Sequence, residues 1–383
     1  MGLEWAAVLL PALVGLVLHW VFPRKVLWYE AVLPIVPALL IIPLVKCSAE
    51  AVQVRDYERR GGWVVEARYF EAWNEYHIQV CTETDSKGNT TVRDCSYVEW
   101  HSPYWELEDS NGYVLPITQP QFDTLQQRFG NRVFRDMHRA YHTQDGDQYA
   151  TCWTGNAAAF QPVFTEHSYE NRIQATHGVV DFPEISPQQA KTLGLYEFPK
   201  LRDPFNDPAI LGKAAGVEQA DQYLQQQNAK LGRGKQVRFW ILLFHNKPRS
   251  VGYDQESYWR GGNKNEVVVT IGLDKQGKPA WCHPFCWAPD GNTSNDAMKI
   301  EIRDFVEQQK VVDPLKTAEF VVASAIDKFQ RKQFKEFAYL TVDMPTWAHV
   351  LVWVLTVLST VGMGVYVVVN PLEAERRPGR EQK

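Results

Sequence analysis

The chain has 383 residues, of which 45% are hydrophobic and 22% are charged, a composition typical of folded rather than disordered proteins. Its 45 acidic and 40 basic side chains give a formal charge of −5. This balance argues against a nucleic-acid-binding protein, which needs a basic surface to displace counterions. The mean hydropathy of −0.33 averages three strongly apolar runs with a long polar middle.

Three apolar runs are long enough to cross a bilayer, whose hydrocarbon core takes about 20 helical residues. They cover Trp5–Phe22, Val26–Val45 and Trp347–Val369. A cleaved signal peptide is the alternative for the first run, but Glu4 stands where such peptides are basic, and a second run follows directly. We therefore predict a transmembrane helical hairpin over residues 1–47, and a transmembrane helix with a basic tail over residues 344–383.

The positive charges predict the orientation, because short cationic loops stay on the cytoplasmic side of a membrane. Arg24 and Lys25 lie in the turn of the hairpin, and the tail after the third run carries Arg376, Arg377, Arg380 and Lys383. Both groups lie on one side in a three-span topology. The sequence therefore predicts a multi-pass membrane protein with a cytoplasmic C-terminal tail and a large extracytoplasmic domain.

Two cysteine pairs are spaced closely enough to form local disulfides. Cys81 and Cys95 flank a polar stretch between two alternating segments, which is typical of a hairpin closed by a bridge. Cys282 and Cys286 are predicted as a second local disulfide, or as two thiols on a strand. A zinc site is the third alternative, but no second cysteine pair follows at the spacing that zinc ligands need.

Residues 48–182 are predicted to form a β-rich subdomain. Alternating stretches indicate strands at Trp63–Phe70, Tyr76–Glu83 and Thr91–Trp100, and a hairpin through Asn111-Gly112. A helix is expected over Gln119–Phe129, followed by a short second helix that reaches His142.

Residues 183–343 are predicted to form an α/β subdomain. Ser186-Pro187 is typical of a helix start, and Val217–Leu231 predicts a helix. Phe239–Phe244 is a continuous apolar run suited to a strand covered on both faces. Two further strands, over Glu266–Ile271 and Pro279–Trp287, precede two closing helices, so that the whole chain is predicted to be a membrane-anchored α+β protein.

This order of helix, buried strand, glycine-containing loop, strand, returning strand and closing helices resembles the TPM domain over about residues 217–334. That resemblance implies an extracytoplasmic α/β domain tethered beside membrane helices, in a family that includes phosphatases and protein-quality-control adaptors. The chain departs from the family at His245–Arg260, where a polar loop is expected in place of a helix. Through Trp259–Glu266 and Glu166–Arg172, the chain also resembles membrane proteins of tailed phages.

The loop Arg260-Gly261-Gly262-Asn263-Lys264-Asn265 is the candidate ligand-binding segment. Its glycines permit close backbone approach, and its two cationic side chains suit an anion. It is not a Walker loop, because Lys264 lacks a following Ser or Thr and no helix follows. A plain β-turn that leads into the next strand is the alternative.

Histidines of the β-rich part suggest a weaker metal site. His138 and His142 would share one face of a helix, and Asp145 and Asp147 lie close by in sequence. Arg139 follows the first histidine where zinc proteases have a glutamate, so ordinary surface or core histidines are the alternative. Trp100, Tyr104 and Trp105, with His101, are a candidate carbohydrate or peptide platform, or else the edge of a core.

Three functions remain open from the sequence. The first is a non-enzymatic binding or accessory protein that is anchored in the lipid bilayer and engages another membrane or envelope protein. The second is a membrane-tethered, metal-dependent, phosphatase-like hydrolase that uses the glycine loop, with Asp254 or Glu256 holding a divalent metal cofactor. The third is an oligomeric channel component, for which Thr360 and Gly364 supply a small-residue association pattern. No assembled catalytic set is identified, so the first is preferred.

Overall fold

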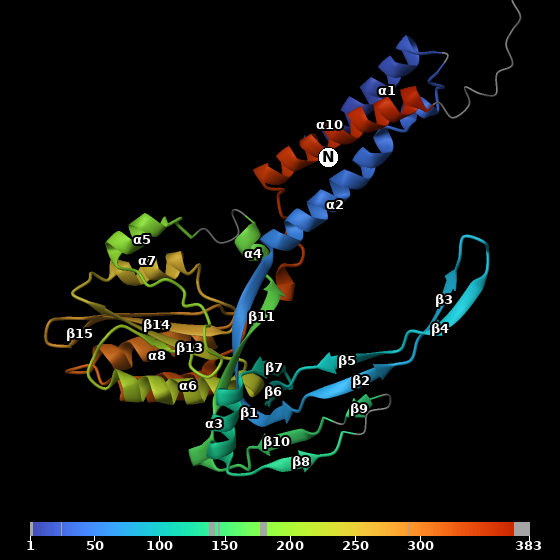
Figure 1. The fold of residues 1–383 in the computed structure, drawn as a ribbon. Helices are drawn as coiled ribbons and strands as arrows, with labels where there is room; N and C mark the ends of the chain where they lie inside the picture. Colours follow the sequence, from blue (N-terminus) through green and yellow to red (C-terminus); the bar gives the residue numbers. More distant parts are fainter. Residues whose placement is uncertain are drawn as a thin grey trace, which may run out of the picture. The chain divides into compact units, whose positions relative to one another are not determined.

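A computed structural model describes residues 3–23, 25–137, 142–144, 146–176, 182–289 and 291–370, with residues 142–144 described as backbone alone. The chain divides into two compact units (Figure 1). As far as they are described, the first contains Met1–Asp56, Ser168–Asp181 and Phe334–Lys383, and the second contains Tyr57–His167 and Phe182–Gln333. The mixed α+β architecture predicted from the sequence is confirmed at this level.

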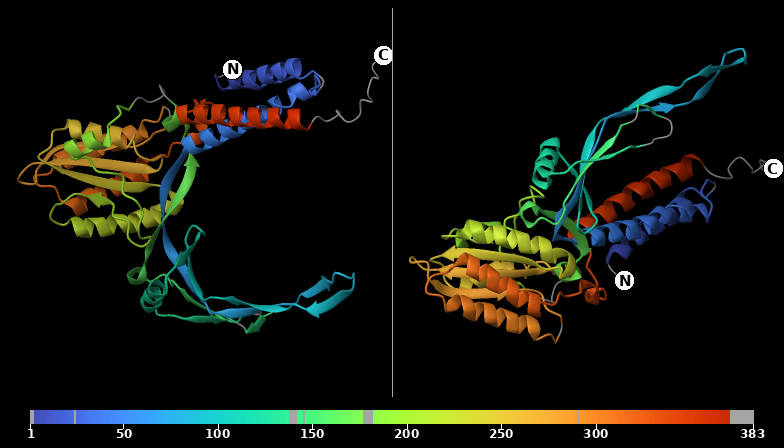
Figure 2. Two further views of the ribbon diagram at one scale, coloured as in Figure 1. Left: turned by 45° about the horizontal axis from the view of Figure 1, so that its top comes forward. Right: turned by 90° about the horizontal axis from the view of Figure 1, so that it is seen from below.

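Three apolar helices dominate the first unit, where they lie side by side (Figures 1 and 2). Each is long and apolar enough to cross a membrane once the short 3₁₀ segments before the first two are included. The elements of this unit are η1 (Leu3–Val8), α1 (Leu9–Val21), η2 (Glu30–Val32), α2 (Ile35–Gln53), α4 (Arg172–Ala175), η4 (Phe334–Phe337) and α10 (Thr346–Val369).

Small residues bring these helices close together. A Cβ added to Gly15 would lie 1.9 Å from the carbonyl oxygen of Ala31, so only glycine fits there. Thr360 is buried, and a Cβ at Gly364 would meet Leu18 at 3.2 Å. The small-residue pattern of α10 therefore packs against the chain's own helices, as small residues do in membrane bundles.

The β-rich part of the second unit is built around one long strand, β1 (Arg55–Phe70), which pairs with β6, β10 and β11. Helix α3 (Gln119–Phe129) packs Phe122, Leu125 and Phe129 onto this sheet. The helix covers the predicted residues, begins in a capping box at Thr118 and ends at Gly130 in the left-handed conformation. The other strands are β6 (Tyr104–Asp109), β7 (Val114–Ile117), β8 (Val133–Arg135), β10 (Gln148–Cys152) and β11 (Pro162–Glu170).

A two-stranded ribbon extends the β-rich part (Figure 1). It consists of β2 (Trp73–His77) paired with β5 (Tyr97–His101), continued by β3 (Val80–Thr84) paired with β4 (Thr90–Asp94). The amide of Cys95 donates to the carbonyl of Gln79 at 2.8 Å between the two ladders, so the register is continuous. A short strand, β9 (His142–Gln144), pairs with the other edge of β2.

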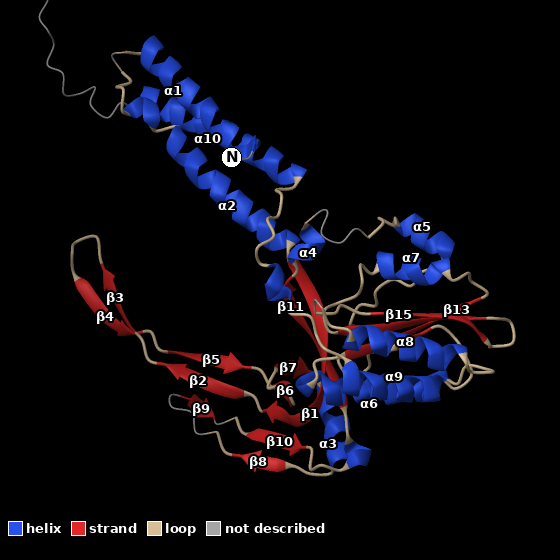
Figure 3. Cartoon of the chain, turned by 180° about the vertical axis from the view of Figure 1, so that it is seen from behind, coloured by secondary structure: helices blue, strands red, loops and turns tan. Residues whose placement is uncertain are grey.

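The α/β part has a four-stranded sheet in the order β12-β13-β14-β15, in which the last strand runs antiparallel to its neighbour. Helices α5 and α7 cover one face, and α6, α8 and α9 cover the other (Figure 3). The elements are α5 (Pro187–Leu193), β12 (Ile210–Leu211), α6 (Val217–Gly234), β13 (Arg238–His245), α7 (Ser250–Tyr258), β14 (Glu266–Leu273), β15 (Pro279–Phe285), α8 (Ser294–Glu307) and α9 (Pro314–Lys328).

The apolar run Phe239–Phe244 is continuous because strand β13 is covered on both faces. Phe239 and Ile241 pack into the core beneath α6, α8 and α9, whereas Trp240 and Leu242 pack into the core on the other face. Because successive side chains of a strand point to opposite faces, a strand covered on both sides must be apolar at every position. The predicted doubly covered strand is confirmed.

Two expectations about local structure are wrong. The segment His245–Arg260 is not a plain polar loop, because it contains helix α7, whose buried Gln255 accepts a hydrogen bond from the amide of Tyr196 at 2.8 Å. His142 begins strand β9 instead of ending a helix. The segment His245–Arg260 is too polar for its periodicity to predict the contacts that order α7.

Candidate functional site

The predicted anion-binding loop connects α7 to β14 and folds back onto its own strand. Arg260, Gly261 and Gly262 have φ angles of 50°, 78° and 76°, a left-handed stretch in which glycine is favoured. The amide of Asn263 donates to Oε2 of Glu266 at 2.8 Å. The two glycines therefore serve a tight turn that leads into β14.

The side chains of this loop point to different partners. Arg260 is exposed, whereas Lys264 Nζ lies 3.8 Å from Oε2 of the buried Glu58. Asn265 is buried and donates from Nδ2 to the carbonyl of Arg59 at 2.8 Å. These contacts join β14 to β1 and give the loop a structural role, while anion binding stays a prediction.

A cluster of buried charges lies next to this junction. Arg59 Nη1 donates to Oδ1 of Asp207 at 2.8 Å, and Arg238 Nη1 forms an ion pair with Oδ2 of the same carboxylate at 2.5 Å. The Arg238 guanidinium lies over the Trp240 ring, 4.2 Å from its centroid, and Trp240 Nε1 donates to Glu266 at 3.0 Å. Burial lowers the pKa of Arg238 and raises the pKa of Glu266, because it disfavours both charged forms. Asp207 therefore contacts both guanidinium groups, and these contacts lie in the interior of the second unit, which is typical of a structural network.

The two acidic residues proposed to hold a metal beside the glycine loop both lie on helix α7 but point to different sides of it. Glu256 Oε2 lies 2.7 Å from Nε2 of His283, whose ring contacts Tyr253. Asp254 instead lines a surface groove with Glu184. Residues two apart on a helix point to different sides, so these two carboxylates do not share a ligand.

The cysteines separate into one bridge and four thiols. The predicted disulfide between Cys81 and Cys95 is present, with a Cα separation of 5.7 Å. The predicted bridge between Cys282 and Cys286 is wrong, because both are free thiols. Cys282 lies in the extended strand β15, and residues four apart in a strand are about 13 Å apart, well beyond the reach of a disulfide. The alternative of two thiols therefore holds.

The weaker histidine site is only partly within the described chain. His138 and Asp145 lie outside the described residues, and of His142 only the backbone is described. The carbonyl of Asp147 accepts a hydrogen bond from the amide of Glu71 at 2.9 Å. The helical spacing that motivated this site does not apply at His142, which pairs in strand register with Glu75.

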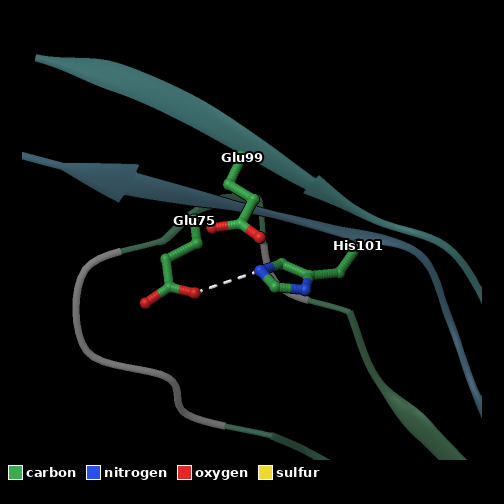
Figure 4. Close-up of side chains that lie close together, drawn as sticks. All are labelled: Glu75, Glu99 and His101. Carbon is green, nitrogen blue, oxygen red and sulfur yellow. Dashed lines mark hydrogen bonds and ion pairs between the residues drawn. The ribbon is translucent and has the colours of Figure 1, made fainter. Parts of the chain in front are cut away.

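A different group of potential metal ligands lies on the ribbon (Figure 4). Ligand atoms of Glu75, Glu99 and His101 all lie within 4.8 Å of one another. His101 Nε2 lies 3.0 Å from Oε2 of Glu75, and His77 Nε2 lies 3.0 Å from Oε2 of Glu99. All four side chains are partly exposed, so water and ions reach them.

This group was not predicted from the sequence, although the chain carries a signal for it. The segments Trp73-Asn74-Glu75-Tyr76-His77 and Tyr97-Val98-Glu99-Trp100-His101 both read aromatic, any residue, Glu, aromatic, His. When two such copies pair antiparallel, glutamate opposes glutamate and each histidine opposes an aromatic residue. The repeated pattern within one predicted hairpin would have identified the group.

The opposite face of the ribbon is apolar and exposed. Tyr76 pairs directly with Val98, and Trp100 follows two positions later on the same face. Their exposed fractions are 38%, 53% and 59%. The other exposed apolar residues that alternation places on this face are Ile78, Val80 and Val92.

The predicted aromatic platform is divided by the structure. Trp100 belongs to the exposed ribbon face, whereas Trp105 stacks on Tyr69 and packs against the core below α3. Tyr104 stacks on Phe70, with ring centroids 4.3 Å apart. The three side chains therefore do not form one flat surface.

Comparison with protein-family models, with curated proteins and with solved structures finds no match to this chain. The geometry of the chain itself is therefore the basis for a functional proposal.

Proposed function

We propose that this protein is a membrane-anchored, non-enzymatic binding or accessory protein, whose second unit engages another membrane or envelope protein. Three helices have the length and apolar composition of membrane spans, which supports the anchoring. The observation that carries the binding function is the exposed apolar face of the ribbon, defined by Tyr76, Val98, Trp100 and their neighbours.

We also propose that the second unit lies outside the cytoplasm. The basic residues of the first hairpin turn and of the C-terminal tail favour a cytoplasmic location for both. The disulfide of the ribbon supports the same orientation, since disulfides persist in oxidising compartments and are rare in the cytosol.

The apolar face has the character of a protein-binding surface. A small sheet normally buries one face against a core, yet both faces of the ribbon carry exposed residues. Uncovered apolar patches commonly mark interaction sites, and aromatic residues such as Trp100 are frequent energetic centres of interfaces. Strand β5 is also a sheet edge, whose unpaired backbone groups can accept a partner strand.

The resemblance of residues 217–334 to the TPM family extends this proposal. Within that family, protein-quality-control adaptors act by binding other proteins, and the four-stranded sheet with helices on both faces is compatible with such a domain. On this proposal, the α/β part is a rigid base from which the ribbon reaches its partner. We also propose that the chain is related to membrane proteins of tailed phages, which it resembles at Trp259–Glu266 and Glu166–Arg172.

Site-specific photocrosslinking in the cells that make the protein tests the binding function. A photoreactive phenylalanine at Val98 or Trp100 is expected to capture the same membrane or envelope protein. The matched controls are Thr91 and Arg93, which are exposed on the polar face of the same ribbon. Equal capture from both faces, or adducts with lipid alone, would contradict the proposal.

A further inference from the structure

We propose that the polar face of the ribbon is a binding site for a divalent transition-metal ion, with Glu75, Glu99 and His101 as its ligands. This site is independent of the apolar face on which the proposed function depends. The inference follows from the strand register, the spacing of the ligand atoms and the packing of the histidine rings.

The strand register places two like charges in direct opposition. Glu75 and Glu99 are cross-strand partners, and opposed like charges destabilise an antiparallel pair. The neighbouring pairs place one histidine on each side of the two carboxylates. A divalent cation bound between the two carboxylates removes this repulsion, which explains why two glutamates are placed opposite each other.

The spacing of the ligand atoms suits a single ion. Ligands that are bound tetrahedrally at 2.0–2.2 Å from zinc lie roughly 3.4 Å from one another. His101 Nε2 lies 3.0 Å from Oε2 of Glu75, and this oxygen lies 3.8 Å from Nε2 of His77. Small rotations of the glutamate side chains therefore suffice to surround an ion. His77 orients Glu99 through its own 3.0 Å contact, as outer partners of metal ligands do.

The histidine rings are already held in place. Trp73 stacks on His101 with ring centroids 4.0 Å apart and an interplanar angle of 10°, and Tyr97 stacks on His77 at 4.7 Å and 16°. The disulfide between Cys81 and Cys95 lies farther along the same ribbon and prevents its register from slipping. Such preorganisation lowers the entropy that is lost when an ion binds.

The donor set identifies the class of ion. Calcium and magnesium prefer sites made entirely of oxygen, and thiolate ligands select copper(I) and iron–sulfur clusters. One imidazole nitrogen with two carboxylates suits zinc and neighbouring first-row divalent ions. Because the ligands are partly exposed, water completes the coordination.

Zinc titration of the full-length, untagged protein in detergent tests the site. A chromophoric chelator competes for zinc after the protein has been stripped with EDTA and the exposed Cys47 has been alkylated. We expect one zinc ion per chain, and at least tenfold weaker binding in His101→Gln and in Glu75→Gln. The matched control is His283→Gln, which removes a histidine 2.7 Å from a glutamate but outside any three-ligand group of the described residues.

Two checks keep the outcome unambiguous. Thiol counting establishes that each variant retains the Cys81–Cys95 bridge. Loss of zinc binding in a variant is then not explained by unfolding of the ribbon. Cobalt(II) in place of zinc is expected to give a visible d–d spectrum that His101→Gln abolishes.

Failure of the wild-type chain to bind zinc, or equal binding in His101→Gln, would show that the histidines and glutamates only pair with one another. Photocrosslinking from Val98 is expected to survive His101→Gln, which separates this inference from the proposed binding function.

Discussion

At the scale of single residues, burial decides which cysteines can react. Cys282 is fully buried in β15, and Cys286, which follows that strand, is partly buried against the same core. Burial raises the pKa of both thiols, that of Cys286 to about 12. The thiolate is the reactive form, so these cysteines are expected to be inert in the folded protein.

Alkylation kinetics test this expectation. With a pKa of about 12, only about 10⁻⁴ of the Cys286 thiol is ionised at pH 8, and this fraction rises roughly tenfold per pH unit. We therefore expect Cys286 to react roughly 10²–10³-fold more slowly than an ordinary exposed thiol. Mass spectrometry of iodoacetamide-treated protein, native and denatured, distinguishes the sites.

Denaturation is the internal control for that experiment. All four thiols should react in denaturant, whereas the two cysteines of the bridge should react only after reduction. Rapid labelling of Cys286 in the native protein would show that the α/β core opens or packs differently.

At the scale of elements, helix α6 and strand β1 approach each other through two glycines. A Cβ added to Gly232 would lie 2.1 Å from the carbonyl oxygen of Gly61, and one added to Gly61 would lie 2.2 Å from that of Asn228. Because backbone atoms cannot move aside as side-chain ends do, this contact requires both glycines. It joins the β-rich and α/β parts of the second unit.

Replacing Gly232 with alanine is expected to destabilise the second unit. Overpacking costs about 1–3 kcal/mol, and because the obstructing atom is a backbone carbonyl oxygen we expect the upper part of this range, which exceeds the gain in helix propensity of about 1 kcal/mol. Gly234 is the matched control, because it lies in the same helix and a Cβ there meets nothing within 4 Å. Gly234→Ala should therefore be neutral or stabilising by up to about 1 kcal/mol.

Denaturant unfolding of the full chain, with hydrogen exchange of peptides from α6 and β1, measures both variants. Faster exchange in Gly232→Ala alone is the expected result. Equal stability of the two variants would mean that the helix shifts at little cost and that the close contact is not essential.

At the scale of the whole molecule, the structural features that depend on a repeating pattern of residues were predictable from the sequence. Apolar runs revealed the three membrane-length helices, and the unbroken run of β13 revealed a doubly covered strand. The alternation around Cys81 and Cys95 revealed the hairpin and its bridge. These features depend on residues near one another in sequence, where periodicity carries the information.

Features that depend on distant partners were not predictable in the same way. Arg59 contacts Asp207, which lies 148 positions later in the sequence, and no local pattern predicts such a pair. Helix α7 is ordered by contacts of Gln255 with Tyr196, which lies in an earlier segment. The ligand group of Glu75, Glu99 and His101 was predictable in part. Its two similar sequence segments can be recognised in the sequence, but the side chains come together only when the two strands pair.

The proposed orientation of the protein in a membrane leads to the last prediction. Positive charges in the hairpin turn and the tail favour a cytoplasmic location for both, and disulfides such as that of the ribbon persist in oxidising compartments. In a Cys47→Ser background, Ser86→Cys in the exposed ribbon turn should react with an impermeant maleimide in sealed cells. Gln382→Cys in the tail should react only after permeabilisation. The reverse labelling pattern would place the second unit in the cytoplasm, where the bridge would be reduced, and would restrict the partners of the apolar face to cytoplasmic proteins.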